Sequence, residues 1–363
     1  MSDPVKLLIV DDSRLFRSAL EEALRGQAGV TVVGSVFSGA RAIEFIRNDP
    51  PDLVTLDVEM PGMDGLETLE QVQAFNKSRP SSPPVGVVMV SAFTRRGEQV
   101  TIKALQAGAF DFIAKPSGGT PESNLITLRD ELLTKLRAFA SSRPGPGATV
   151  GAVGARISPP ARPAGLRAAQ VRVVVIGAST GGPRALSEML PPLCRAVDLP
   201  ILIVQHMPPG FTRSFAESLM RQTGRNVVEA SDGVPLERAS AYIAPGARHL
   251  LVRGTSATPL TALNEQPPEN GCRPSADVLF RSAAAIFGGE VVAVILTGMG
   301  KDGAAGLGAI RRAGGHIIAQ DQATSVVWGM PGSAVEAGVV DEVLPLDRIP
   351  AAVASVVNRA STK

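Results

Sequence analysis

The chain has 363 residues, of which 44% are hydrophobic and 19% are charged, so it is long enough for about two or three folded domains and too apolar for a disordered protein. Its 36 Lys and Arg residues almost balance its 34 Asp and Glu residues, which argues against a protein that coats nucleic acid or an anionic membrane. Aromatic residues make up only 4%, which also disfavours a platform on which single-stranded bases stack.

The cysteine content and the length of the apolar runs indicate the compartment. Cys194 and Cys272 are too few for a disulfide framework. No apolar run reaches the roughly eighteen residues of a membrane span, and the first one, residues 7–10, ends at Asp11. We therefore expect a cytoplasmic protein with no direct membrane insertion.

Apolar runs alternate with amphipathic stretches over residues 1–140. The apolar runs predict strands at residues 6–10, 31–36, 53–57, 85–90 and 110–114. The amphipathic stretches predict helices at residues 14–25, 40–47, 65–75, 99–107 and 125–139. This alternation predicts an α/β domain built on a five-stranded, parallel, doubly wound sheet.

Acidic side chains stand at the ends of two strands of this predicted sheet. Asp11 and Asp12 come directly after the first strand, and Asp57 ends the third. Because ligands bind at the carboxyl ends of parallel strands, we expect these three carboxylates to meet there. They would repel one another without a divalent cation, and oxygen ligands suit Mg²⁺. Asp57 could then attack phosphorus as a nucleophile and form an aspartyl phosphate.

Two further residues lie at the same predicted edge. Ser91 ends the fourth strand, and Lys115 follows the fifth. Their hydroxyl and ammonium groups could both bind phosphoryl oxygens. A tight turn would aim the ammonium, so we expect the Lys115–Pro116 bond to be cis. One acidic pair at a strand end usually marks a solvated turn, and only the five positions together indicate a site.

Four runs resemble the response-regulator receiver domain: VDDS at 10–13, TLDVEMPGMDGLE at 55–67, SA at 91–92 and AGAFDFIAKP at 107–116. The resemblance implies that a histidine kinase transfers a phosphoryl group to Asp57. It implies that Mg²⁺ is held by Asp11, Asp12, Asp57 and the backbone carbonyl of Glu59. It also implies that Ser91 and Phe112 occupy switch positions, whose side chains reorient after phosphorylation.

Residues 141–170 differ in composition from the segments on either side. They are rich in Pro, Gly and Ala and contain neither an acid nor an aromatic residue. This composition predicts a linker, and the alternative is an irregular loop that packs on one domain. The domain boundaries that we predict are therefore 1–140, a linker over 141–170, and 171–363.

The alternation of strands and helices resumes after residue 170. Apolar runs predict strands at residues 171–176, 201–204, 291–296, 316–319 and 339–344. Amphipathic stretches predict helices at residues 183–190, 211–221, 276–287, 304–313 and 349–360. We therefore expect a second doubly wound α/β domain.

The segment VRVVVIGASTGGPRAL at 171–186 predicts a buried strand, a glycine-rich turn and a helix. The turn fits GxSxG, in which Ser179 would be raised above the sheet as a nucleophile. It does not fit the dinucleotide fingerprint GxGxxG, because Ser179 occupies the place of the second glycine. A short GxSxG motif is a weak signal, so nucleotide binding and helix capping by Ser179 or Thr180 are alternatives.

A nucleophilic serine needs a base, and the chain has three histidines. His206 follows the strand at 201–204 and should therefore lie at the same carboxyl edge as Ser179. His249 and His316 each precede an apolar run, which places them at amino ends if those strands are parallel to the others. We therefore predict that His206 is the base.

An acid that orients the base should lie at the same edge. Asp302 follows the strand at 291–296, within the run TGMGKDG at 297–303. In a triad it would orient the imidazole of His206 and stabilise the imidazolium. Backbone N–H groups of the run could bind an oxyanion. The alternative is an ordinary N-cap for the helix at 304–313.

Most of the chain after the linker resembles the chemotaxis response-regulator protein-glutamate methylesterases. The matching runs are IGASTGGP at 176–183, VQHMPPGFT at 204–212, YIAPG and RHL within 242–250, RPSADVLFRSAA at 273–284, LTGMGKDGAAGL at 296–307 and QDQATSVVWGMPG at 320–332. The resemblance implies Ser179 as nucleophile, His206 as base and Asp302 as orienting acid. It also implies an oxyanion contact from the backbone near Met299, with Thr180 beside the site.

The resemblance also implies a substrate and a mode of regulation. The substrates would be glutamate γ-methyl esters on methyl-accepting chemoreceptors, hydrolysed without a cofactor, together with particular receptor glutamines that are deamidated. The unphosphorylated receiver domain would cover the active site until Asp57 is phosphorylated. The alternative is a response regulator whose output domain binds a nucleotide through residues 177–182 without catalysis. The balanced charge disfavours a nucleic-acid partner.

Overall fold

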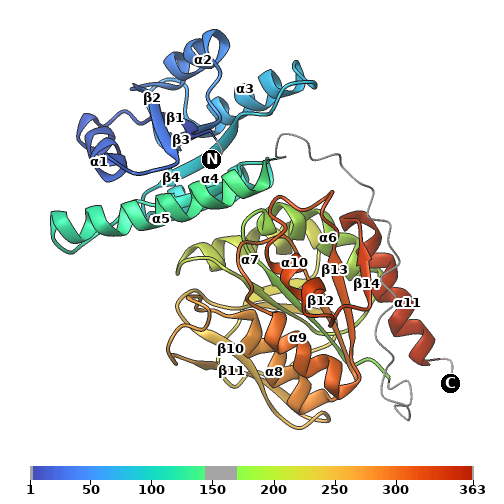
Figure 1. Ribbon diagram of the computed structural model, residues 1–363. Helices are drawn as coiled ribbons and strands as arrows, with labels where there is room; N and C mark the ends of the chain where they lie inside the picture. Colours follow the sequence, from blue (N-terminus) through green and yellow to red (C-terminus); the bar gives the residue numbers. More distant parts are fainter. Residues whose placement is uncertain (1–2, 144–169, 362–363) are drawn as a thin grey trace. The chain divides into compact units, whose positions relative to one another are not determined.

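The computed structural model describes residues 3–143 and 170–361 (Figure 1). The chain forms two compact units, Met1–Pro144 and Gly145–Lys363. Most of the predicted linker lies outside the described residues, so the linker stays a prediction. Within the described ranges, no helix is both long enough and apolar enough to cross a membrane.

A five-stranded parallel sheet organises the N-terminal unit, in the order β2-β1-β3-β4-β5. The strands are β1 (Val5–Val10), β2 (Val30–Val36), β3 (Leu53–Asp57), β4 (Gly86–Ser91) and β5 (Asp111–Ala114). They alternate with α1 (Arg14–Leu24), α2 (Gly39–Asn48), α3 (Gly65–Lys77), α4 (Arg95–Gln106) and α5 (Pro121–Ser142). The α/β fold class predicted from the sequence is confirmed for this unit.

Polar caps explain why two of these helices begin earlier than predicted. The hydroxyl of Thr94 accepts a hydrogen bond from Gly97 N before α4, and that of Thr120 accepts one from Ser123 N before α5. Such caps satisfy backbone N–H groups that have no partner inside the helix. The first turns of α4 and α5 are polar, so the hydrophobic periodicity begins only after the helix has started.

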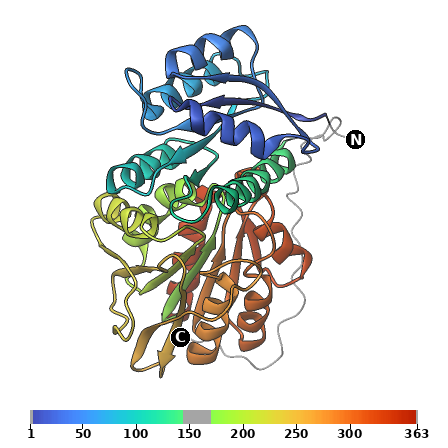
Figure 2. The same ribbon diagram turned by 90° about the vertical axis from the view of Figure 1, so that its left-hand side faces the viewer.

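A seven-stranded parallel sheet forms the centre of the C-terminal unit, in the order β14-β13-β12-β6-β7-β9-β8. Its strands are β6 (Val173–Ala178), β7 (Ile201–Gln205), β8 (Asn226–Glu229), β9 (Ser240–Ile243), β12 (Val291–Ile295), β13 (His316–Gln320) and β14 (Glu342–Leu344). The helices are α6 (Gly182–Ala196), α7 (Phe211–Thr223), α8 (Ala276–Phe287), α9 (Ala304–Ala313), α10 (Met330–Glu336) and α11 (Ile349–Ser361). They cover both faces of the sheet, where α6 packs against α7 and α11, and α8 packs against α9 (Figures 1 and 2).

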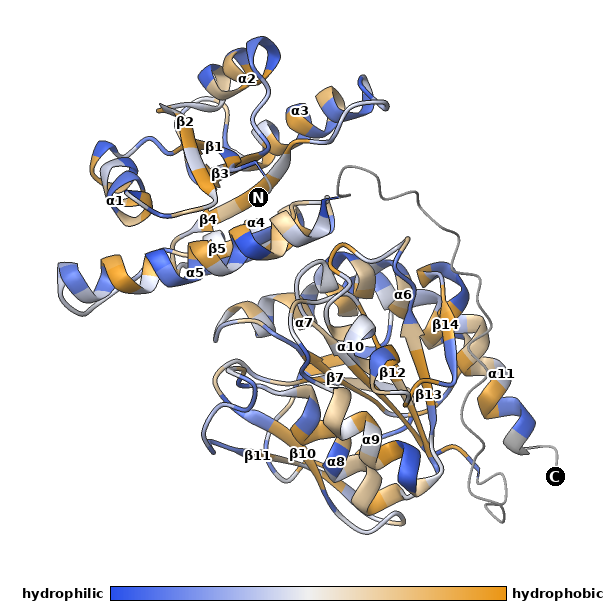
Figure 3. Cartoon of the chain, in the orientation of Figure 1, coloured by the Kyte–Doolittle hydropathy of each residue, from blue (hydrophilic) through white to orange (hydrophobic). Residues whose placement is uncertain are grey.

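Three adjacent strands, β12, β6 and β7, form the most apolar part of this sheet. Every residue in them is buried, as expected for parallel strands covered on both faces, and Figure 3 colours β7 and β12 as hydrophobic. Ile295 of β12 pairs with Gly177 of β6, and Ala178 of β6 pairs with Gln205 of β7. The loops that follow these strands therefore start side by side at one edge.

Four strands and one helix of this unit were not predicted. They are β8, β9, α10 and the strands β10 (His249–Gly254) and β11 (Pro259–Asn264). The last two form a separate antiparallel sheet. His249 was expected at an amino end of the sheet only if its strand ran parallel to the others, and this condition fails, because β10 pairs antiparallel with β11. Its strand turns back on β11 and packs against α8 instead of joining that sheet.

Candidate functional site

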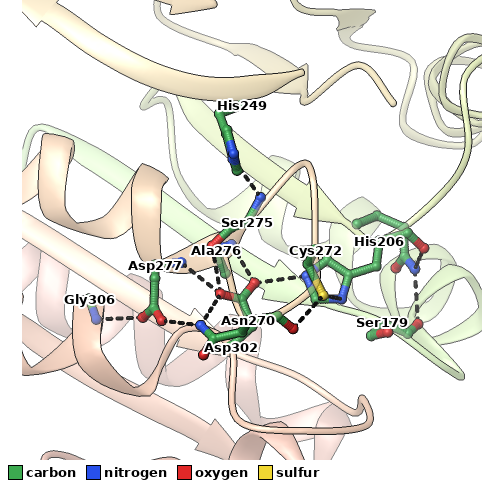
Figure 4. A network of polar contacts seen from close by, with 11 residues as sticks. Ser179, His206, His249, Asn270, Cys272, Ser275, Ala276, Asp277, Asp302 and Gly306 are labelled. Carbon is green, nitrogen blue, oxygen red and sulfur yellow. Dashed lines mark hydrogen bonds and ion pairs between the residues drawn. The ribbon is translucent and has the colours of Figure 1, made fainter. Parts of the chain in front are cut away.

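Three loops at the carboxyl edge of the C-terminal sheet carry the predicted catalytic side chains (Figure 4). Ser179 follows β6, His206 follows β7, and Asp302 lies between β12 and α9. Backbone hydrogen bonds fix the first two loops. Ser179 N donates to Thr297 O at 3.0 Å, and His206 N donates to Ala178 O at 3.0 Å.

His206 and Asp302 are in direct contact. Nε2 of His206 lies 2.8 Å from Oδ2 of Asp302, and the exposed fractions of the two side chains are 14% and 2%. Burial alone would lower the pKa of His206, but its hydrogen bonds to Asp302 and Cys272 outweigh burial and raise that pKa to about 9. A hydrogen-bonded carboxylate of this kind holds an imidazole in one orientation.

Asp302 is held by donors at the start of α8. Oδ1 accepts from Ser275 Oγ at 2.6 Å, and Oδ2 accepts from Ala276 N at 2.6 Å. Asp277 N and Asn270 Nδ2 each donate to Oδ1 at 3.3 Å. Burial would raise the pKa of Asp302, but the hydrogen bonds from His206, Ser275 and Ala276 lower it to about 2. The carboxylate therefore stays charged and also caps the first turn of α8.

His249 contacts Ser275, which is one of the residues that bind Asp302. It is buried, and its Nδ1 accepts a hydrogen bond from Ser275 N at 3.2 Å (Figure 4). Its Nε2 lies 3.2 Å from Pro267 O. Neither His249 nor Ser275 was predicted to belong to the site. Their one signal was the position of each within a run, RHL or RPSADVLFRSAA, that carried the family resemblance.

His316 lies away from the site, at the amino end of its strand as expected. Its Nε2 is 2.9 Å from Glu342 Oε1, and Nδ1 is 3.6 Å from Asp341 Oδ2. Asp341 also pairs with Arg311. This group of charged side chains links β13 and β14 to α9 at the end of the sheet opposite Ser179.

The backbone around Ser179 is fixed by buried polar side chains. Gln205 Nε2 donates to the carbonyl of Ser179 at 2.9 Å. The hydroxyl of Thr297 donates to the carbonyl of Thr180 at 2.9 Å and accepts from Val327 N at 3.0 Å. Both Gln205 and Thr297 are buried, and neither was predicted to belong to the site. The turn that carries Ser179 and Thr180 is therefore rigidly placed.

The glycine-rich run after β12 passes directly against Ser179. A Cβ atom built on Gly298 would lie 2.7 Å from Ser179 Cβ and 2.4 Å from Met330 Sδ. Only glycine allows the backbone to approach this closely. Met299, whose backbone was expected to contact the oxyanion, is the next residue and therefore lies beside the predicted nucleophile.

The structure does not join Ser179 to His206 through their side chains. Among the described residues, Ser179 Oγ makes no hydrogen bond to the imidazole, and Nδ1 of His206 faces Sγ of Cys272 at 3.5 Å. Contacts of a catalytic base often tighten only when substrate binds. The arrangement therefore brings His206 and Asp302 together, with Ser179 on the adjacent loop.

A cavity of about 340 Å³ lies next to the turn that carries Ser179 and Thr180. Its walls come from α6 and from the segments that follow β12 and β13, and they include Gly181, Arg184, Thr297 and Val326. Cavities of this size bind parts of ligands in many proteins. This one lies on the α6 side of the turn.

A second group of predicted residues meets at the carboxyl edge of the N-terminal sheet. Carboxylate oxygens of Asp11, Asp12 and Asp57 all lie within 4.8 Å of one another. Nζ of Lys115 is 2.8 Å from Asp11 Oδ2 and 3.0 Å from Asp57 Oδ2. Three carboxylates supply the hard oxygen donors that Mg²⁺ prefers, so the chemistry of the donor set fits the ion. The expectation of a cis Lys115–Pro116 bond is wrong, because the long lysine side chain reaches both carboxylates without it.

The charges in this pocket shift two pKa values. Burial, together with the negative charge of Asp11, raises the pKa of Asp57 to about 6. The positive charge of Lys115 lowers this pKa, but by less than the other two effects raise it. Burial would lower the pKa of Lys115, but its hydrogen bond to Asp11 and the charge of Asp57 raise it instead. Lys115 therefore remains a cation between the two carboxylates.

Three further residues were predicted to belong to this pocket: Ser91, Phe112 and Glu59. Ser91 is buried, and its hydroxyl donates to Ala92 O at 3.3 Å. Phe112 is also buried. The backbone N–H of Glu59 donates to the carboxylate of Asp57. The measured contacts therefore join Asp11, Asp12, Asp57 and Lys115, whereas the roles of Ser91, Phe112 and the Glu59 carbonyl stay predictions.

Comparison with known protein families matches both units. The family model described as CheB methylesterase matches residues 174–353, and the response regulator receiver domain matches residues 7–124. The crystal structure of the CheB methylesterase catalytic domain of Thermotoga maritima has 43% sequence identity to this chain and a TM-score of 0.50. It covers 52% of this chain and 99% of its own.

Curated relatives match almost the full length of the chain. A protein of Koribacter versatilis, named protein-glutamate methylesterase/protein-glutamine glutaminase 2, is 44% identical over 96% of this chain and 94% of its own length. A protein of Pseudomonas aeruginosa with the same name is 44% identical over 96% of both chains.

Proposed function

Because this chain belongs to the CheB methylesterase family and carries a receiver domain, we propose that it hydrolyses glutamate γ-methyl esters on chemoreceptors. The names of the relatives give both a glutamate methylesterase and a glutamine glutaminase activity, and we propose both for this chain. Relatives with these names over 96% of the chain do not fit the alternative of a non-catalytic nucleotide-binding output domain.

The contact between His206 and Asp302, beside the turn that carries Ser179, is the observation that carries this proposal. Ser179 attacks the ester carbonyl, and its proton passes to His206. Nδ1 accepts the proton, because Nε2 is already bonded to Asp302. Methanol leaves after taking a proton from the imidazolium, and water then hydrolyses the acyl-enzyme.

Backbone donors near Met299 would stabilise the oxyanion that forms on the ester carbonyl. The close approach of Gly298 to Ser179 supports this role, because it brings the glycine-rich run against the nucleophile. The hydrogen bond from the hydroxyl of Thr297 to the carbonyl of Thr180 holds the turn that carries Ser179 in place. The hydrolysis needs no cofactor, since these residues supply the nucleophile, the base and the oxyanion site.

In the receiver domain, we assign the phosphoryl-accepting role to Asp57. Asp11, Asp12, Asp57 and the backbone carbonyl of Glu59 would hold Mg²⁺, which neutralises charge on the transferring phosphoryl group. Lys115 and Ser91 would bind phosphoryl oxygens, and Phe112 would move with Ser91 after transfer. The phosphodonor is a histidine kinase of the same signalling system, and phosphorylation relieves inhibition of the esterase by the receiver. A histidine kinase as phosphodonor and chemoreceptors as substrates both support a cytoplasmic location for this protein.

Release of methanol from a methylated chemoreceptor fragment tests the proposed hydrolysis. We expect Ser179→Ala to lower the rate by at least about 10³-fold. Ser187→Ala is the matched control, because its hydroxyl only bonds Pro183 O within α6. Ammonia release from the unmethylated glutamine form of the fragment tests the deamidation in the same variants. A Ser179→Ala protein that retains most of its methanol release would refute the proposal.

A further inference from the structure

One side chain that contacts the proposed base has no assigned step in the proposed ester hydrolysis. Cys272 belongs to the segment that precedes α8, and its Sγ lies 3.5 Å from Nδ1 of His206 (Figure 4). This is the imidazole nitrogen that must accept the proton of Ser179, because Nε2 is bonded to Asp302. Anything that binds both the thiol and this nitrogen would therefore remove the base from the reaction.

The two atoms have the chemistry and the spacing of zinc ligands. Zinc binds thiolate sulfur at about 2.3 Å and imidazole nitrogen at about 2.0–2.1 Å with tetrahedral angles, which separates the two ligand atoms by roughly 3.5 Å. The observed distance between Sγ of Cys272 and Nδ1 of His206 is 3.5 Å. A sulfur and an imidazole nitrogen also favour thiophilic ions over Mg²⁺ or Ca²⁺, which prefer oxygen.

Asp302 supplies the outer partner that zinc-binding histidines usually have. A histidine that binds a metal through one nitrogen commonly donates from the other to a carboxylate, which fixes the ring and makes it a better ligand. His206 and Asp302 stand in this relation at 2.8 Å. Donors from Ser275 and Ala276 already occupy the oxygens of Asp302, so it positions His206 and is not itself a ligand.

The site is open to an ion from solution. Cys272 and His206 are both partly exposed, so an ion in solution can reach their ligand atoms. Two arginines near Cys272 in the sequence are bonded to groups other than Cys272 and His206. Arg273 donates to the carbonyls of Glu265 and Gln266, and Arg281 pairs with Glu269.

We propose that Cys272 and His206 form a zinc-binding site, and that the bound ion inhibits ester hydrolysis. When Zn²⁺ binds, it forms bonds to Sγ and to Nδ1, and the protons that the thiol and the imidazolium carry on these two atoms are released to solvent. Ser179 then has no base to take its proton. The inhibitory part rests on the proposed function, whereas the binding site itself does not.

Cobalt tests the site without any measurement of activity. Co²⁺ replaces Zn²⁺ in such sites and gives a thiolate-to-metal charge-transfer absorption in the near ultraviolet only when sulfur is a ligand. We expect this absorption when Co²⁺ is added to the full-length, chelator-treated protein. Cys272→Ser should abolish it, whereas Cys194→Ser, which changes a buried cysteine in α6, should not. The absence of the absorption from the unmodified protein, or its persistence in Cys272→Ser, would overturn the proposal.

Zinc titration of methanol release tests the inhibition. Each protein is compared with its own rate in the presence of chelator. We expect Cys272→Ser to need at least about tenfold more Zn²⁺ for half-inhibition than the unmodified protein, because one of two protein ligands is lost. Cys194→Ser should behave like the unmodified protein. Equal half-inhibition in all three proteins would overturn the inhibitory part, even if the cobalt spectra identify the ligand. A protein with the cobalt signal but no esterase activity would refute the proposed function and leave the metal site standing.

Discussion

Nε2 of His206 and Oδ2 of Asp302 lie 2.8 Å apart, although 96 positions separate these residues in the chain. The contact exists because β7 and β12 lie on either side of β6 in the sheet. It gives the two groups opposite pKa shifts, with that of His206 raised to about 9 and that of Asp302 lowered to about 2.

The first prediction concerns the pH dependence of ester hydrolysis. Only neutral His206 can accept the proton of Ser179, so kcat/KM should rise with pH and level off above its pKa of about 9. Asp302→Asn removes the charge that favours the imidazolium, so the rise should move toward the ordinary histidine value of about 6.5. The plateau should also fall, by up to about 10⁴-fold. A pH profile of kcat/KM with the same midpoint in both proteins would contradict this.

The second prediction concerns the support of Asp302. Ser275→Ala removes a 2.6 Å hydrogen bond to a buried carboxylate. Hydrogen bonds to charged groups contribute about 1.5–3 kcal/mol, so we expect kcat to fall roughly 10- to 150-fold with little change in KM. Ser282→Ala is the control, since Ser282 lies in α8, which begins directly after Ser275, and its hydroxyl bonds Val252 N and Leu279 O. Steady-state kinetics of the two variants should differ, and similar values would count against a role for Ser275.

The third prediction concerns the approach of Gly298 to Ser179. In Gly298→Ala, the new methyl group would clash with Ser179 Cβ and Met330 Sδ, so the nucleophile must shift. A misplacement of about 1 Å costs on the order of 100-fold in rate, and we expect a loss of that size in kcat. Gly308→Ala in α9 meets only the flexible Arg312 side chain and should keep its activity. Equal activity of the two alanine variants would contradict this prediction, because it would show that the loop accommodates the methyl group without moving Ser179.

The fourth prediction concerns phosphorylation. With Mg²⁺ and a small-molecule phosphodonor, the unmodified protein should incorporate phosphate and release methanol faster. Asp57→Asn should show neither response, because it lacks the nucleophilic oxygen. Asp52→Asn is the control, since Asp52 precedes the other end of β3 and bonds Lys6 N. Phosphate incorporation measured by mass spectrometry checks the site. Incorporation into Asp57→Asn would refute the assignment.

Sequence patterns predicted the elements that are buried and regular. The bounds of β3, α8 and α9 were predicted without error, because buried parallel strands and amphipathic helices have strong periodicity. The patterns also placed Ser179, His206 and Asp302 at one edge, since each follows a strongly apolar strand. Chain order at strand ends was sufficient for that step.

Other parts of the site depend on pairings that no local pattern reveals. The hairpin of β10 and β11 brings His249 to Ser275, and nothing in the run that contains His249 distinguishes an antiparallel partner from a parallel one. Cys272 likewise reaches His206 from 66 positions away. Such contacts arise only after the chain has folded, so the second layer of the site could not be predicted from the sequence.

The order of the strands places the three loops with the proposed catalytic residues side by side at the centre of the sheet. Loops after these three central strands carry Ser179, His206 and Asp302 and cannot change length without moving the reacting atoms. Loops after the flanking strands β9 and β13 begin at the same edge but carry none of these residues. The loop after β13 also fixes the turn of Ser179, through the bond of Val327 N to Thr297, so altered selectivity among receptor sequences should be sought in the loop after β9, with the other loops unchanged.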